Sequence, residues 1–285
     1  MSYIEAADMI DAASEALAYL KNTPRPTGRG REAEFKWDRL AGACWTYLGI
    51  LMDRDVGGPV PALLSQFYYA QSIVDQMKFG MDNDETEDYR DNALYCDADG
   101  FKYYGPNDKD PSKPGEPIRF VRDEKDERGN VKWSQGFYFF NFIKMWIEGV
   151  QTPTNNAICK GRDLAVTVPD IDAMIWCKRA LKTLNVVIPT KVDEGFQLAD
   201  DAFETMSKYW VHELAHYYGQ VDDGPLVDVP AVDEDGKPEY DADGKRGKVY
   251  RLARLVNLVA NMPELAANTA EAYAYFAMAV YVEAL

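Results

Sequence analysis

The fold of this chain is decided by residues 210–219, Trp-Val-His212-Glu213-Leu-Ala-His216-Tyr-Tyr-Gly219. The stretch contains both histidines of the 285-residue chain, four positions apart, with a glutamate directly after the first. Residues four apart lie one above the other on the same face of an α-helix, so both imidazoles can reach one ion. Apolar residues recur at helical spacing through residues 196–218, and Gly219 is a typical residue for ending a helix. The sequence therefore predicts a helix that presents two imidazoles side by side.

The order of residues in this motif is typical of a catalytic zinc helix, written HExxH. Neutral imidazole nitrogens suit Zn²⁺, and three protein ligands leave a fourth position open for water. Glu213 is turned about 100° round the helix from His212, so it flanks the ion and can take a proton from the bound water. We therefore expect Zn²⁺ on His212 and His216, Glu213 as general base, and hydrolysis of peptide bonds as the reaction.

The third zinc ligand has three candidates in the sequence. Asp222 completes the pattern HExxHxxGxxD of the metzincins, with Met262 available as a Met-turn. Glu264 and Glu271 lie seven positions apart on the last predicted helical region, so they face similar directions and periodicity does not separate them. The residues alone leave all three open.

A resemblance favours one of them. Residues 269–281, Thr-Ala-Glu-Ala-Tyr-Ala-Tyr-Phe-Ala-Met-Ala-Val-Tyr, resemble the C-terminal signature of deuterolysin-like (aspzincin) metallo-endopeptidases, the fungal lysine-specific branch in particular. In that family an acidic residue two positions before a tyrosine binds the zinc, which implies Glu271 as the third ligand. Tyr273 is then a candidate to donate a hydrogen bond to the oxyanion, although aromatic residues on such a helix more often pack in a core.

The cysteines add to this resemblance. Cys159, Cys177 and the residues around them resemble a disulfide-closed hairpin of the family, and the resemblance covers residues 157–285. It implies a secreted protein with two disulfides, Cys159–Cys177 and Cys44–Cys96. None of the four cysteines forms a CxxC pair, which argues against a zinc site made of thiolates. Residues 1–8 are unlike a signal peptide, so either the protein is cytosolic or the chain is a mature segment with an added Met.

The charge of the chain limits its partners. Asp and Glu outnumber Lys and Arg by 47 to 31, which gives a net charge of −16. This charge repels phosphate backbones and anionic lipids, and no apolar run approaches the roughly 20 residues of a membrane span. We expect a peptide or protein substrate, and neither nucleic acid nor a membrane as partner.

The fold predicted from these patterns is a single α+β, zincin-like domain over residues 1–285, mainly helical. Residues 1–80 have helical periodicity and form an N-terminal helical layer. Residues 81–190 are β-rich, with short runs at 101–104, 118–121, 131–133 and 137–140 between turn-rich segments. Residues 191–285 contain the active-site and C-terminal helices, interrupted by an acidic insertion over 222–248.

The sequence leaves two rival functions open. A catalytically weak or inactive zincin-like module could keep the scaffold for binding alone. A metzincin-like peptidase would instead use Asp222 as its third ligand. Glu213 favours an enzyme, because a site that only binds metal has no use for a base beside it.

Overall fold

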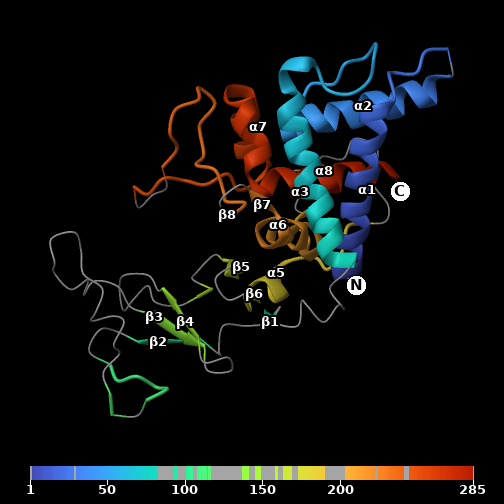
Figure 1. Ribbon diagram of the computed structural model, residues 1–285. Helices are drawn as coiled ribbons and strands as arrows, with labels where there is room; N and C mark the ends of the chain where they lie inside the picture. The colour runs from blue at the N-terminus through green and yellow to red at the C-terminus, as the bar shows by residue number, and fades with distance from the viewer. Residues whose placement is uncertain are drawn as a thin grey trace. The chain divides into compact units, whose positions relative to one another are not determined.

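The structure is a computed structural model, and it describes residues 2–28, 30–82, 93–95, 101–104, 108–113, 115–116, 137–140, 145–148, 158–159, 163–168, 173–189, 203–221, 224–240 and 244–284. The chain is mixed α+β, as expected (Figure 1). It divides into two compact units, one of residues 1–90 with 184–285 and one of residues 91–183. The single domain expected over 1–285 stays a prediction, and each unit is described by itself.

The first unit is helical. Its three N-terminal helices lie where the sequence has helical periodicity, and Figure 1 shows α1 and α3 side by side. The unit contains α1 (Ser2–Asn22), α2 (Arg31–Leu48), η1 (Pro61–Leu63), α3 (Leu64–Asp82), α6 (Met206–Tyr218), β7 (Gln220–Val221), β8 (Gly224–Pro225), α7 (Leu252–Asn261), η6 (Pro263–Asn268) and α8 (Ala270–Ala284).

Helix α8 is the centre of this unit. It packs against α1, α2 and α6, and every residue from 270 to 278 is buried. A helix that is apolar on all sides belongs in a core, and α8 follows this rule except at Glu271, which is only 2% exposed. A carboxylate buried in such surroundings needs partners that offset its lost hydration. Those partners lie at the candidate site.

Helix α6 carries the histidine motif, and its two ends are fixed locally. Thr205 caps the start, because its hydroxyl accepts a hydrogen bond from the Lys208 backbone N–H at 3.2 Å. Gly219 ends the helix, and a Cβ there would lie 2.3 Å from the Ala215 carbonyl oxygen. The periodicity placed the helix start near residue 196, whereas α6 begins at Met206. Residues 196–202 lie outside the described residues.

The second unit contains two small sheets, which agrees with the β-rich region expected over 81–190. Strands β1 (Ala93–Tyr95), β6 (Ala173–Trp176) and β5 (Ala165–Val168) form one sheet in that order, with β1 parallel and β5 antiparallel to β6. Strands β2 (Phe101–Tyr104), β3 (Phe137–Phe140) and β4 (Met145–Glu148) form an antiparallel sheet. Helix α5 (Ala180–Thr183) follows β6. The runs expected at 118–121 and 131–133 lie outside the described residues.

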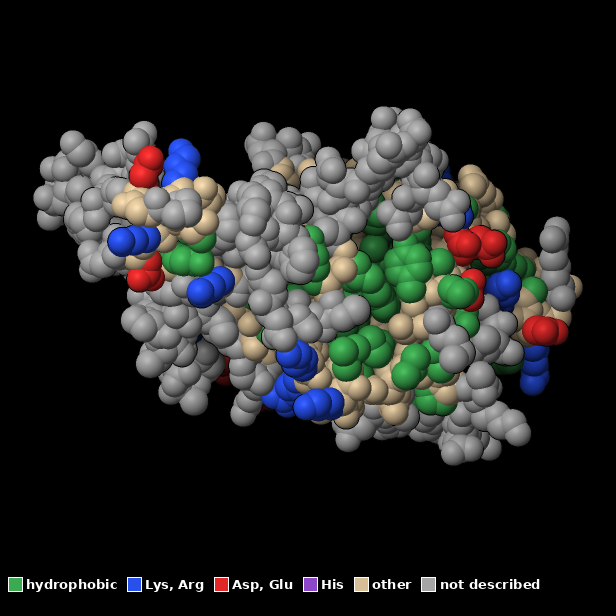
Figure 2. All heavy atoms as spheres, turned by 90° about the horizontal axis from the view of Figure 1, so that it is seen from below, with side chains coloured by type: hydrophobic (Ala, Val, Ile, Leu, Met, Phe, Trp, Pro, Cys, Tyr) green, Lys and Arg blue, Asp and Glu red, His purple; other side chains and the backbone are tan. Residues whose placement is uncertain are grey.

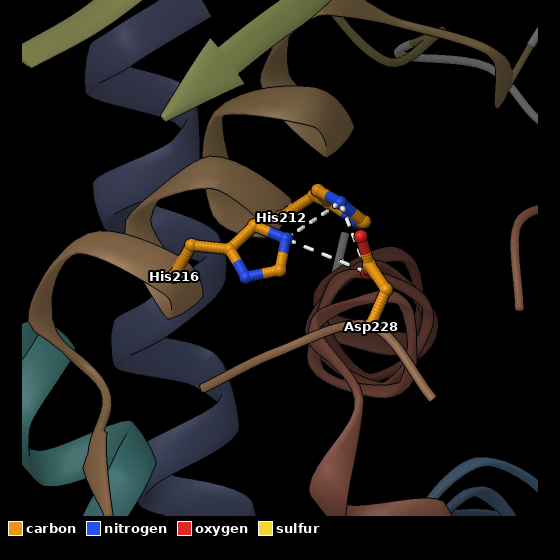
Figure 3. A group of neighbouring side chains, drawn as sticks. All are labelled: His212, His216 and Asp228. Atoms are coloured by element: carbon orange, nitrogen blue, oxygen red, sulfur yellow. Dashed lines mark hydrogen bonds and ion pairs between the residues drawn. The ribbon is translucent and has the colours of Figure 1, made fainter. Parts of the chain in front are cut away.

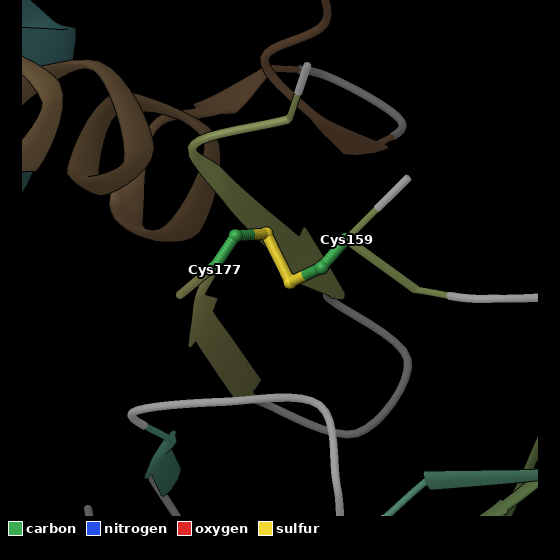
Figure 4. The surroundings of a disulfide bond; sticks show 2 residues. All are labelled: Cys159 and Cys177. Carbon is green, nitrogen blue, oxygen red and sulfur yellow. A yellow bond between two sulfur atoms is a disulfide. The ribbon is translucent and has the colours of Figure 1, made fainter. Parts of the chain in front are cut away.

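One of the two expected disulfides is present. Cys159 and Cys177 form a disulfide bond, with their Cα atoms 5.3 Å apart (Figure 4). Cys177 is the residue directly after β6. Cys44, by contrast, is a free thiol on α2 with no exposed surface. Burial raises the pKa of this thiol. The expected Cys44–Cys96 disulfide is therefore wrong, because the Cys44 thiol is free and faces the apolar core. Cys96 itself lies outside the described residues.

We expect denaturation without reduction to expose Cys44 to alkylation and to leave Cys159 and Cys177 unlabelled. Peptide mass spectrometry of the unreduced digest should find these last two cysteines on joined peptides. Reduction before alkylation is the control, and it should label both. Failure to label Cys44 in denaturant would show that Cys44 is bridged after all.

Charged and apolar side chains both reach the surface on one face of the molecule. Figure 2 shows one face, on which Lys and Arg side chains and Asp and Glu side chains lie in small separate groups around exposed apolar side chains. None of the helices in the described part of the chain is long and apolar enough to cross a membrane.

Candidate metal centre

Three side chains converge beside α6. The Nε2 atoms of His212 and His216 are 3.2 Å apart, and Oδ1 of Asp228 lies 3.6 Å from the first and 3.4 Å from the second. Figure 3 shows the two rings and the carboxylate turned toward one another. These three residues are the group in the described part of the chain that could hold a metal ion.

The chain that follows α6 brings Asp228 to the histidines. Beyond Gly219 it forms the short β7–β8 pair, and the Leu226 backbone N–H donates to the Gly219 carbonyl oxygen at 2.8 Å. This hydrogen bond returns the chain to the end of the helix. Two residues later, the Asp228 side chain lies beside the imidazoles with 5% of its surface exposed.

The outer nitrogens of both histidines have acceptors. Nδ1 of His216 lies 2.6 Å from the Leu226 carbonyl oxygen, and Nδ1 of His212 lies 2.9 Å from Oε2 of Glu271. A carbonyl oxygen and an ionised carboxylate can only accept, so each ring donates from Nδ1. When both rings are neutral, each turns the lone pair of its Nε2 toward the other ring and toward Asp228. This is the usual arrangement of histidines that bind a metal through Nε2.

The three converging atoms fit a tetrahedral ion. Zinc–ligand distances of about 2.0–2.1 Å give a tetrahedron with edges of about 3.3–3.4 Å, close to the three separations of 3.2, 3.4 and 3.6 Å. Oδ1 of Asp228 is buried and has no hydrogen bond to any residue that the structure describes. Two lone pairs and a carboxylate oxygen at these distances repel one another unless a cation lies between them.

The electrostatics of the site favour such a cation. Burial opposes the charging of His212, but the hydrogen bond and charge of Glu271, together with the charges of Asp228 and Glu213, raise its pKa to about 9. Burial also opposes the ionisation of Glu271, yet the charge of Lys208 and the hydrogen bond to His212 lower its pKa to about 2. The site therefore stabilises a positive charge between the imidazoles, either a proton or a metal ion.

Glu213 and Tyr250 flank this group. Glu213 is 6% exposed, and its charge acts on His212 and on Tyr250. The hydroxyl of Tyr250 donates to Oδ2 of Asp228 at 2.8 Å, and its ring centroid lies 5.9 Å from that of His212. Burial of the hydroxyl and the charge of Asp228 raise the pKa of Tyr250. Tyr250 as a whole residue is nevertheless 42% exposed.

The remaining residues expected at the site are placed differently. Glu271 contacts the outer nitrogen of His212, on the far side of the ring from the converging atoms, so it is not part of the metal group. Tyr273 has no exposed surface, and its hydroxyl donates to the Ala267 carbonyl oxygen at 2.7 Å, so it belongs to the core. Glu264 is exposed on η6, and Asp222 lies outside the described residues.

Asp228 and Tyr250 were missed from the sequence. Asp228 stands in the apolar run Pro-Leu-Val-Asp-Val-Pro over residues 225–230, and a charge in such a run is a usable signal. No comparable signal marks Tyr250, which is one of 18 tyrosines.

Comparison with known proteins leaves the site to be interpreted from its own chemistry. No protein-family model matches the chain, and neither a curated protein nor a solved structure is significantly similar to it. The structure itself shows an α+β chain with a buried His212, His216 and Asp228 group that can hold a metal ion.

Proposed function

We propose that this chain is a zinc-dependent metallo-endopeptidase with a zincin-like fold, in which His212, His216 and Asp228 hold the zinc. The observation that carries the proposal is the convergence of two Nε2 lone pairs and a carboxylate oxygen at the edge lengths of a tetrahedron. Imidazole and carboxylate together suit zinc, and three protein ligands are the usual number in a catalytic site. Bound there, zinc supplies polarisation of the scissile carbonyl and activation of a water molecule.

Glu213 is the proposed general base. It neighbours His212 on α6 but lies outside the group of three converging residues. It is buried, and its charge acts on both His212 and Tyr250. A carboxylate in this position can accept a proton from the attacking water and deliver it to the leaving amine.

In this proposal Tyr250 takes the role of oxyanion donor that was expected of Tyr273. Its hydroxyl lies at the edge of the metal group, and its ring is partly exposed, so a bound peptide can approach it. A hydroxyl donor near the attacked carbonyl stabilises the negative charge that develops on its oxygen. The disulfide Cys159–Cys177 also supports an oxidising compartment, and we propose that the protein acts outside the cytosol.

The purified protein is expected to hold about one zinc ion per chain, because the site offers the usual catalytic ligand set. The double variant His212→Ala/His216→Ala should hold none. Elemental analysis after removal of loosely bound metal measures both. The chain has no other histidine, so any zinc left in the double variant would have to be bound by other groups, and this would contradict the site.

Digestion of a mixed peptide library, followed by sequencing of the products, tests the activity. Hydrolysis should stop when zinc is removed by a chelator and return when zinc is restored. Zinc binding without hydrolysis of any peptide would instead support a zincin-like binding module.

A further inference from the structure

The residue one turn before His212 on α6 is a lysine with no exposed surface. Nζ of Lys208 lies 2.8 Å from Oε1 of Glu204, 3.1 Å from the hydroxyl of Tyr275 and 3.6 Å from Oε1 of Glu271. Lysine is almost never fully buried unless it is paired. Because removing an ammonium from water is costly, a lysine at this place calls for a reason other than packing.

Glu271 connects this ammonium to the metal-facing ring. Its Oε1 accepts from the Arg251 backbone N–H at 2.8 Å and faces Lys208, while its Oε2 faces Nδ1 of His212 at 2.9 Å. The two oxygens are thus held by different partners, which fixes the plane of the carboxylate. Arg251 has a φ of 74°, a conformation rare outside glycine, and in that conformation it donates to Glu271.

We propose that Lys208 is a positioning residue of the metal centre, which holds the Glu271 carboxylate so that His212 keeps its proton on Nδ1 and aims Nε2 at the metal. The inference rests on the proposed metal site. Lys208 acts on the metal centre through Glu271, because it contacts Glu271 but is not a member of the converging group. Partners in this second layer usually change metal affinity by 10- to 100-fold when they are removed.

Glu204 provides a matched control. It is the other carboxylate on the same ammonium, at 2.8 Å, but its side chain is 28% exposed and it has no contact with His212 among the described interactions. Glu204→Gln removes a charged partner of Lys208 and leaves the path through Glu271 intact. A role of Lys208 in stability alone would make both substitutions costly and leave zinc affinity unchanged in both.

The experiment measures zinc affinity by competition with a chelator and records the ring signals of zinc-loaded protein labelled with ¹⁵N-histidine. Lys208→Met should weaken zinc binding by roughly 10- to 100-fold and shift the ¹⁵N signals of His212. The signals of His216 should stay in place, because its Nδ1 contacts the Leu226 carbonyl oxygen and not Glu271. Glu204→Gln should match the parent protein in both measurements.

A folded Lys208→Met variant with the zinc affinity and His212 signals of the parent would overturn the proposal, whatever its melting temperature. If Lys208→Met does not fold, Glu204→Gln/Lys208→Met removes the ion pair as a whole and is compared with Glu204→Gln under the same criteria. If the parent protein binds no zinc, the proposed function fails and this inference fails with it. Parental zinc binding together with an unaffected Lys208 variant overturns the inference alone.

Discussion

Asp228→Ala is expected to reduce the zinc affinity of the protein by more than the 10- to 100-fold typical of an outer-layer substitution. The substitution removes the one anionic member of the converging group, so that two neutral imidazoles remain. It also removes the acceptor of the Tyr250 hydroxyl. A competition titration with a chelator measures the loss, and elemental analysis should find zinc well below one ion per chain.

Three other carboxylates serve as controls for this result. Glu271→Ala should fall within the 10- to 100-fold range, because Glu271 contacts the outer nitrogen of His212. Glu264→Ala, at an exposed position, should bind zinc like the parent protein. Asp222→Ala is expected to do the same. Retention of zinc by Asp228→Ala, with its loss in Glu271→Ala, would assign the third ligand to Glu271.

The part of the site that the sequence predicted is the part that helix geometry determines. Two histidines four positions apart must share a face of any α-helix, and α6 does bring their Nε2 atoms to 3.2 Å. The end of that helix at Gly219 is local in the same sense, because it depends on one backbone position. These features needed no knowledge of how distant segments meet.

The position of Asp228, the third member of the metal group, does depend on how separate segments of the chain come together. Asp228 reaches the histidines only because the chain turns back after Gly219, and helical periodicity carries no information about that return. The argument that a carboxylate among apolar residues needs a cationic or donating partner holds for Glu271, which is 2% exposed. Its partners are an imidazole, a lysine and a backbone N–H, which the sequence could not distinguish from a metal.

The strands show the same division between local and distant information. Aromatic and β-branched runs predicted β2 and β3 at their observed residues. The parallel pairing of β1 with β6 joins Ala93 to Ala173, and no local pattern specifies a partner so far along the chain. Tyr273 illustrates the limit for side chains: its position near Glu271 in the sequence suggested the site, but its hydroxyl faces the Ala267 carbonyl oxygen in the core.

Glu213→Gln is expected to keep zinc and to lose peptide hydrolysis by roughly 10²- to 10⁴-fold, the usual contribution of a general base. The amide keeps the shape of the side chain, and Glu213 lies outside the group of converging ligand atoms, so metal content should stay near one ion per chain. What the amide cannot do is accept the proton of the attacking water. The turnover rate and the zinc content, measured on the same preparation, separate these two effects.

The choice of control decides what the Glu213→Gln result means. Glu204→Gln makes the same chemical change at a partly exposed carboxylate just before the start of α6, and it should keep its activity. Hydrolysis near the parental rate in Glu213→Gln would remove Glu213 as the base and leave the zinc site standing. Loss of zinc in Glu213→Gln would mean that Glu213 supports the metal itself, since its buried charge is one of those that act on His212. Zinc retained together with hydrolysis lost is the combination that a base beside a His–His–Asp metal centre requires.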